Sequence, residues 1–155
     1  RATDLRNDGF LWWSTSGLTA SDFYVEVSAV ADSCEGKDSY GIGARIGGSG
    51  YDRGYTLEFS CDGHYRLRRF NSDSPPEVLL DWTQSDAIET GAGSENRIGL
   101  LAEGSVLIGF ANGEVLQEVR DEFYVYGNFG LFAESNQTET TTALFRDFSL
   151  WYLQD

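Results

Sequence analysis

Glu58, Arg66 and Arg68 are side chains whose types and spacing could build a binding site. Glu58 lies on one run of alternating apolar and polar residues, and Arg66 and Arg68 lie on the next run. Successive side chains of a strand point to opposite faces, so the three charged groups share a face if their apolar neighbours face a core. Arg45 alternates with apolar residues on the preceding run and joins them if that strand lies alongside. Guanidinium groups bind oxygen-rich ligands through paired hydrogen bonds, so this face could hold a sugar, a carboxylate or a sulfate.

The same charged residues have a purely structural alternative. Cross-strand ion pairs such as Glu58 with Arg66 stabilise a sheet by about 0.5 kcal/mol without binding anything. A local group of arginines stands out in a chain with 11 Lys and Arg against 25 Asp and Glu. The sequence leaves both interpretations open.

Aromatic residues near expected loops could supply a stacking surface for a sugar. Tyr51 and Trp82 lie in or beside such loops, where an exposed ring next to polar groups would contact the apolar face of a sugar. For Trp82, and for Trp151 near the end of the chain, the alternative is a place in the hydrophobic core. The adjacent Trp12 and Trp13 would point to opposite faces of a strand.

A tight turn at 61–63 must position Glu58 against the two arginines. A three-residue turn sets Phe59 opposite Tyr65 and Leu57 opposite Leu67, and it places Gly63 where a positive φ is needed. A two-residue turn would instead set apolar residues opposite charged ones. The matching of like with like predicts the three-residue turn.

Alternation with a period of two residues dominates the chain, and no segment shows a sustained helical period. Asn112-Gly113 between two apolar runs is a strong hairpin signal, because a type I′ turn needs positive φ at both positions. About ten to twelve short antiparallel strands with glycine-rich turns predict an all-β sandwich or barrel that forms one domain over residues 1–155. The expected strands are 23–29, 42–46, 55–60, 65–68, 78–82, 97–102, 105–111, 114–120, 128–134 and 142–153.

Charge and composition restrict the classes of partner that the chain can bind. The net charge is −14, so duplex nucleic acid and anionic membrane surfaces would be repelled. No apolar run approaches the roughly 20 residues of a membrane span, so membrane insertion is not expected. The chain has no Met, which indicates a processed product or a domain cut from a larger protein.

The two cysteines predict a disulfide. Cys34 and Cys61 both lie in polar turn contexts, whereas buried free thiols usually lie within apolar runs. A bridge between two loops is therefore expected in preference to two free thiols, and it implies an oxidising compartment, extracellular or at the cell surface.

The ordered set of strand and turn motifs resembles the concanavalin A-like lectin/glucanase superfamily, and within it the laminin-G-like and 3-keto-disaccharide hydrolase-like sandwiches. The matching motifs are YGIGAR at 40–45, YTLEF at 55–59, GHYRL at 63–67, LDWT at 80–83, NRI at 96–98, NG at 112–113 and FRDFSL at 145–150. The resemblance implies two packed antiparallel sheets in a jelly-roll arrangement. Members bind or cleave glycans or mediate adhesion, and the fold does not decide among these.

The resemblance also implies a structural calcium. Many members carry one near an acid on the last strand, a place that Asp147 matches. Calcium takes six to eight oxygen ligands, to which Asp4, Asp22 and loop carbonyls could contribute.

Catalytic signatures are weak. The Glu-x-Asp-x-x-Glu run of the glucanases is missing, and the acids at 118–122 lie in the wrong phase at a strand end. A catalytic triad would have to use His64, which flanks a tight turn. The sequence therefore predicts a non-catalytic extracellular recognition module for carbohydrate. The alternatives are a structural or adhesive subunit of a surface assembly that binds another surface protein, and a glycan-cleaving hydrolase.

Overall fold

The computed structural model describes residues 2–4, 12–72 and 74–153, and the side chains from Gly17 onward. Within these residues there are twelve strands and no α-helix, hence no helix that could cross a membrane. The strands are β1 Ala2–Asp4, β2 Trp12–Ala20, β3 Phe23–Ser33, β4 Ser39–Gly47, β5 Arg53–Ser60, β6 His64–Asn71, β7 Glu77–Gln84, β8 Glu95–Glu103, β9 Val106–Ala111, β10 Glu114–Arg120, β11 Gly127–Glu134 and β12 Thr141–Tyr152.

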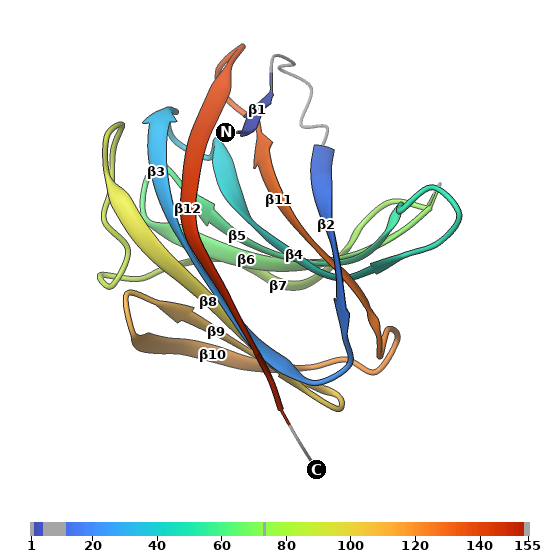
Figure 1. Cartoon of the computed structure of the whole chain (residues 1–155). Coiled ribbons are helices and arrows are strands. Elements are labelled where there is room, and N and C mark those ends of the chain that lie inside the picture. Colours follow the sequence, from blue (N-terminus) through green and yellow to red (C-terminus); the bar gives the residue numbers. More distant parts are fainter. Residues whose placement is uncertain (1, 5–11, 73, 154–155) are drawn as a thin grey trace.

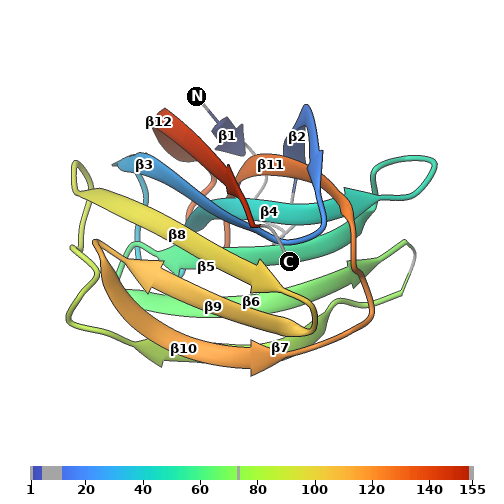
Figure 2. The same cartoon turned by 60° about the horizontal axis from the view of Figure 1, so that its bottom comes forward.

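The strands form two antiparallel sheets that pack face to face (Figure 1). Sheet A has the order β1-β12-β3-β8-β9-β10, and sheet B has the order β2-β11-β4-β5-β6-β7. Figure 2 shows both sheets as curved layers, with β10 and β7 at corresponding edges. The predicted all-β jelly-roll sandwich is confirmed.

The core follows from the two-residue alternation. Along β3 the side chains alternate between buried and half-buried, with Phe23, Val25 and Val27 completely buried. The inner side chains of sheet B, such as Leu57 and Phe59, pack against them. Burial of these apolar groups is the main term that stabilises the sandwich, and it fixes which side of each strand faces outward.

Both predicted turns have the expected register. Phe59 lies opposite Tyr65 across the three-residue turn, and Gly63 has a φ of 86°. Asn112 and Gly113 have φ values of 53° and 84°, and together they form the two-residue turn between β9 and β10. The first of these turns sets Glu58 directly opposite Arg66.

The predicted disulfide is confirmed. Cys34 follows β3 and Cys61 begins the turn after β5, and their sulfurs are bonded with the two Cα atoms 5.8 Å apart. The bridge therefore joins a connection that leaves sheet A to a turn of sheet B, at one end of the sandwich.

Candidate ligand-binding face

Glu58 is the centre of a hydrogen-bonded group on the outer face of sheet B. Its carboxylate is completely buried. It accepts hydrogen bonds from Arg66 Nη2 at 2.8 Å, from Arg68 Nε at 2.5 Å and from Arg68 Nη2 at 2.7 Å. Thr56 Oγ1 donates to it at 2.7 Å from the same strand. The structure thus brings Glu58, Arg66 and Arg68 together on one face as predicted.

Glu134 is a second carboxylate in the same group, and it was not predicted from the sequence. It ends β11, three places from β6 in sheet B, and accepts a hydrogen bond from Arg68 Nη2 at 2.5 Å. Burial and the nearby charge of Glu58 raise the pKa of Glu134 to about 7, although Arg68 opposes the shift. One guanidinium therefore holds two carboxylates, of which one binds a proton readily near neutral pH.

Trp82 lies beside this group on the edge strand β7, next to β6. The Arg66 guanidinium lies over the Trp82 ring, 4.2 Å from its centroid, which is cation–π geometry. Trp82 is half-buried, and the Arg66 side chain keeps 14% of its surface exposed. Nη1 of Arg66 makes no hydrogen bond to any residue that the structure describes. An aromatic ring and a free N–H edge thus face outward above a buried carboxylate.

Phe132 borders the group on the side away from Trp82. It lies on β11, opposite Gly41 of β4, which in turn pairs with Glu58. A side chain at Gly41 would meet the carbonyl oxygen of Leu57 at 2.0 Å and the Phe132 ring at 3.1 Å. Glycine at this position leaves room for the Phe132 ring to lie over β4, so the charged group is enclosed by an aromatic ring on each side. We call Glu58, Arg66, Arg68, Glu134 and Trp82 together the recognition face.

Arg45 does not belong to the recognition face, and this part of the prediction is wrong. Its strand does lie beside β5, as expected. A β-bulge shifts the register between Ala44 and Gly47, and Arg45 takes a φ of 50°. The bulge changes the phase of the alternation, so the Arg45 side chain leaves the outer face.

Arg45 is instead buried, and it forms hydrogen bonds to three of the loops that connect strands. Its guanidinium donates to the carbonyl oxygens of Ser21 at 2.6 Å and of Gly104 and Tyr124, each at 2.9 Å. The Asp22 carboxylate lies 3.4 Å away. Burial lowers the pKa of Arg45, and the neighbouring Tyr55 and Asp22 offset this in part. The role supported by these contacts is structural.

Tyr51 lies away from the recognition face. It is 50% exposed in the connection between β4 and β5 and has a φ of 52°. Glu58 lies five positions after Arg53 on β5, which corresponds to about 16 Å along the strand. A stacking role for Tyr51 at this face is therefore not supported.

Asp147 lies on the other sheet, in a bulge of β12 between Arg146 and Ser149. It is exposed and has a φ of 56°, and its carbonyl oxygen accepts a hydrogen bond from Arg97 Nη1 at 2.8 Å. No group of three His, Cys, Asp or Glu side chains within the described residues could hold a metal ion. Neighbouring guanidinium groups do not suit a calcium site, so calcium at Asp147 stays a prediction without structural support.

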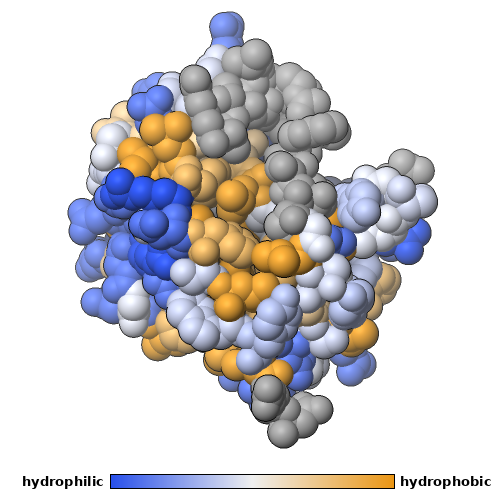
Figure 3. Space-filling model, in the orientation of Figure 1, coloured by the Kyte–Doolittle hydropathy of each residue, from blue (hydrophilic) through white to orange (hydrophobic). Residues whose placement is uncertain are grey.

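Trp151 is not a core residue, contrary to the expectation. It is 51% exposed and lies on the outer face of sheet A. This is the face of the molecule that Figure 3 shows. The side chains of Trp12 and Trp13 lie outside the described part of the chain. His64 is partly exposed, with Nδ1 3.2 Å from the Asp62 carboxylate.

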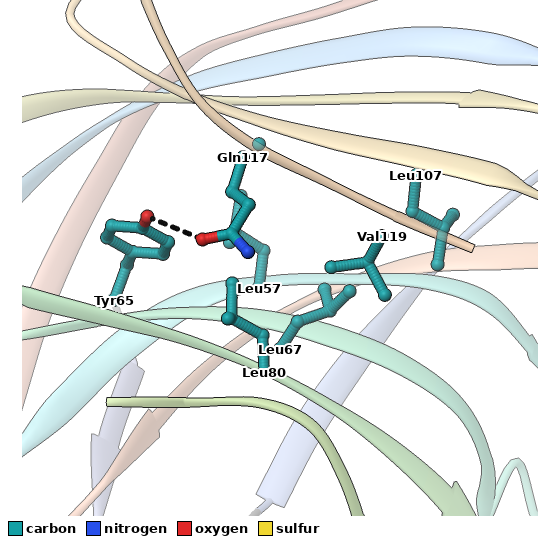
Figure 4. Close-up of a pocket in the computed structure, with 8 residues that line it drawn as sticks. Leu57, Tyr65, Leu67, Leu80, Leu107, Gln117 and Val119 are labelled. Carbon is teal, nitrogen blue, oxygen red and sulfur yellow. Dashed lines mark hydrogen bonds between the residues drawn. The ribbon is translucent and has the colours of Figure 1, made fainter. Parts of the chain in front are cut away.

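A small hollow between the sheets is apolar and unlike the recognition face (Figure 4). It lies where the edge strands β7 and β10 approach each other. Tyr65 donates a hydrogen bond to Gln117 Oε1 at 3.3 Å across it. The lining residues are Leu57, Tyr65, Leu67, Leu80, Leu107, Gly109, Gln117 and Val119. No charged group lines the hollow, so it is best described as a packing gap between two sheet edges.

Comparisons with known proteins define the fold. No family model and no curated protein matches the sequence. The carbohydrate-binding module CBM66 from Bacillus subtilis is similar in structure, with a TM-score of 0.77 and 18% identity over 94% of this chain and 83% of that one. A tetrameric galectin from the ball sponge Cinachyrella sp. has a TM-score of 0.64 and 11% identity over 92% of this chain and 99% of that one. Sheep galectin-11 has a TM-score of 0.59 and 14% identity, with coverages of 90% and 96%. These likenesses show the fold alone.

Proposed function

We propose that this chain is a non-catalytic carbohydrate-recognition module that binds sugar at the recognition face. The observation that carries the proposal is the placement of Arg66, which is stacked on Trp82 and paired with the buried Glu58. Structural neighbours that are a carbohydrate-binding module and galectins support it. As part of the same proposal, the chain is related most closely to the laminin-G-like and 3-keto-disaccharide hydrolase-like sandwiches.

The chemistry of the face suits a sugar. The Trp82 ring offers an apolar surface to the C–H face of a pyranose or furanose, and the free N–H edge of Arg66 donates to hydroxyl oxygens. Glu58 fixes the Arg66 guanidinium, so little side-chain entropy is lost when the ligand binds. A preformed site of this kind needs no large rearrangement.

Charge balance favours a neutral sugar over an acidic one. Two arginines face two carboxylates, Glu58 and Glu134, within the same group. The net charge of −14 further opposes the approach of an anionic polymer. The ligand class we propose is therefore an uncharged glycan.

A glycan-cleaving hydrolase is the second candidate, and one specific observation favours it. Glu58 and Glu134 both accept from one nitrogen of Arg68, so the accepting oxygens are at most about 5 Å apart, close to the separation in retaining glycosidases. The pKa of Glu134 is raised, as for a general acid. Both carboxylates are buried and bonded to Arg68, however, and so cannot reach a glycosidic bond as they stand. Their arrangement supports a binding role.

An adhesive subunit that binds a surface protein is the third candidate. It needs exposed apolar surface, and the connection between β10 and β11 offers Phe123, Val125 and Tyr126, each more than half exposed. The disulfide agrees with an extracellular or cell-surface location for any of the three functions. Concentration-dependent oligomers without sugar affinity would favour this candidate.

A glycan array, followed by isothermal titration calorimetry on any sugar that binds, tests the proposal. We expect Trp82→Ala and Arg66→Ala to weaken binding at least about tenfold, because each removes one of the outward-facing groups. The matched control is Arg120→Ala, since the Arg120 side chain is 70% exposed on sheet A. Unchanged affinity in both site variants would refute the recognition face, and glycan hydrolysis that is lost in Glu134→Gln would favour the hydrolase.

A further inference from the structure

We propose that the outer face of sheet A carries a second saccharide-binding site, formed by Tyr24, Glu26, Arg97 and Trp151. This surface lies on the side of the sandwich opposite the recognition face. The proposal rests on three contacts within the site and does not depend on whether the recognition face binds sugar.

Tyr24 and Trp151 form an aromatic surface. They are directly paired on neighbouring strands β3 and β12, and their ring centroids lie 5.5 Å apart with the planes tilted by 35°. Phe110 forms an edge-to-face pair with Tyr24, with the ring centroids 5.6 Å apart. Trp151 is half exposed and contacts the Tyr24 ring, so a large part of its surface is open to solvent beside that ring.

Glu26 and Arg97 supply the polar part of the site next to these rings. Tyr24 Oη donates to Glu26 Oε2 at 3.0 Å, and Arg97 Nε donates to the other carboxylate oxygen. Arg97 Nη1 donates to Ser28 Oγ at 3.0 Å, whereas Nη2 has no hydrogen-bond partner within the described part of the chain. Both charged side chains are about one quarter exposed. A guanidinium N–H edge and carboxylate lone pairs therefore remain within reach of a ligand.

A glycine within β8 makes this arrangement possible. Gly99 of β8 lies opposite Glu26 of β3, and a side chain there would meet the Tyr24 hydroxyl oxygen at 2.4 Å. Tyr24 can therefore lie across Gly99 and reach both Glu26 and Phe110. Figure 3 shows hydrophobic residues gathered in the middle of this face, with hydrophilic residues along one border.

The combination of groups points to a saccharide. A purely apolar face would suit a protein partner, but here an exposed aromatic ring lies beside a fixed carboxylate–guanidinium pair with a free donor. The recognition face has the same three group types, Trp82 with Arg66 and Glu58. Sugars are recognised by an aromatic surface under the C–H groups and by charged hydrogen-bonding groups at the hydroxyls. Burial raises the pKa of Tyr24 to about 12, so its hydroxyl stays a donor to Glu26 at ordinary pH.

Native affinity electrophoresis tests the second site. The full chain is run in gels that contain a soluble β-glucan, galactan, fructan or xylan, and the dissociation constant is taken from the retardation. The variants are Trp151→Ala, Trp82→Ala and the double variant. The control is Tyr152→Ala, because Tyr152 is exposed, follows Trp151 directly and extends from the other side of β12. Thermal unfolding confirms that each variant is folded.

On the polysaccharide that retards the wild-type protein, we expect Trp151→Ala to weaken binding by about tenfold and Tyr152→Ala to leave it unchanged. Trp82→Ala should retain part of the retardation, and the double variant should lose all of it. If the Trp151→Ala variant is retarded as strongly as the wild-type protein, the second site is refuted and the recognition face is unaffected. Weakening by Trp151→Ala alone would refute the recognition face instead. No retardation of the wild type would refute both, and oligomers that Trp151→Ala dissociates would assign this face to a second copy of the chain.

Discussion

Arg68 Nη2 and Glu134 Oε2 are joined at 2.5 Å although their strands, β6 and β11, are separated by β4 and β5 in sheet B. The contact spans two strands because Gly41 of the intervening β4 has no side chain on this face. Arg68 also holds Glu58, so one cation compensates two buried carboxylates. Arg66 forms hydrogen bonds to only one of these carboxylates, that of Glu58, and its side chain is partly exposed to solvent.

The two arginines should therefore differ in their effect on stability. Arg68→Met leaves Glu134 without its close partner, and we expect a loss of about 3–5 kcal/mol in the free energy of unfolding. Arg66→Met leaves Glu58 paired with Arg68, and the expected loss is smaller, about 1.5–2 kcal/mol. Urea denaturation measures both. Equal losses would show that the two guanidinium groups are structurally equivalent.

Glu134 should make stability depend on pH. Its pKa rises from 4.5 to about 7 on folding, so between these values the folded state holds a proton that the unfolded state releases. The contribution of this group to stability therefore falls as pH rises from 4.5 to 7. Glu134→Gln removes the titration, so the stability of the variant relative to wild type should increase over that window and level off above it.

Urea unfolding at intervals between pH 4.5 and pH 8 checks this. The control is Glu114→Gln, an exposed glutamate at the start of β10, which should give a curve parallel to that of the wild type. A parallel curve for Glu134→Gln as well would contradict the prediction.

Arg45 should be essential for stability and irrelevant to ligand binding. Arg45→Met leaves the carbonyl oxygens of Ser21, Gly104 and Tyr124 without their donor, and we expect a loss of about 3 kcal/mol. The matched control Arg120→Met removes an exposed arginine and should cost less than about 0.5 kcal/mol. Weakened sugar binding in a folded Arg45→Met variant would contradict this and would show that Arg45 contributes to the binding site.

The disulfide should stabilise the folded chain mainly by restricting the unfolded one. The bridge closes a loop of 27 residues, for which loop entropy gives about 3–4 kcal/mol. We expect the free energy of unfolding, measured with urea, to fall by roughly this amount in the double variant Cys34→Ser with Cys61→Ser. A loss below about 1 kcal/mol would show that the unfolded chain is already compact there.

Calcium removal offers a direct test of the calcium site that the sequence predicts at Asp147. The surroundings of this residue lead us to expect the same melting temperature in EDTA and in millimolar calcium. A melting temperature that rises with calcium, and does not rise in Asp147→Asn, would establish a site that the contacts do not suggest.

Local pattern is sufficient to predict the hairpin of β5 and β6. Alternation along these strands, together with the register of the 61–63 turn, places Glu58 beside Arg66 and Arg68, because all three depend on contacts between adjacent segments. The turn contexts of Cys34 and Cys61 likewise suffice to pair them. For Trp82 the sequence allows either a stacking or a core position, and only the bulge that sets it over Arg66 decides between the two.

Longer-range features could not be predicted from the sequence. Glu134 reaches the site because β11 inserts between β2 and β4, a pairing that no local pattern specifies. The prediction for Arg45 is wrong because a bulge reverses the alternation, and an arginine with a positive φ carries no sequence signal comparable to Asn112-Gly113. The only hint for Glu134 is its place at the end of an expected strand.

The order of the strands has a consequence for how this domain forms during synthesis. The last two strands occupy interior positions, β11 between β2 and β4 and β12 between β1 and β3. Until β11 and β12 have emerged from the ribosome, each sheet lacks the strand that joins its N-terminal edge to the rest. We therefore expect the nascent chain to stay unfolded until β12 has emerged, and then to fold slowly, as sandwiches with distant strand pairings do.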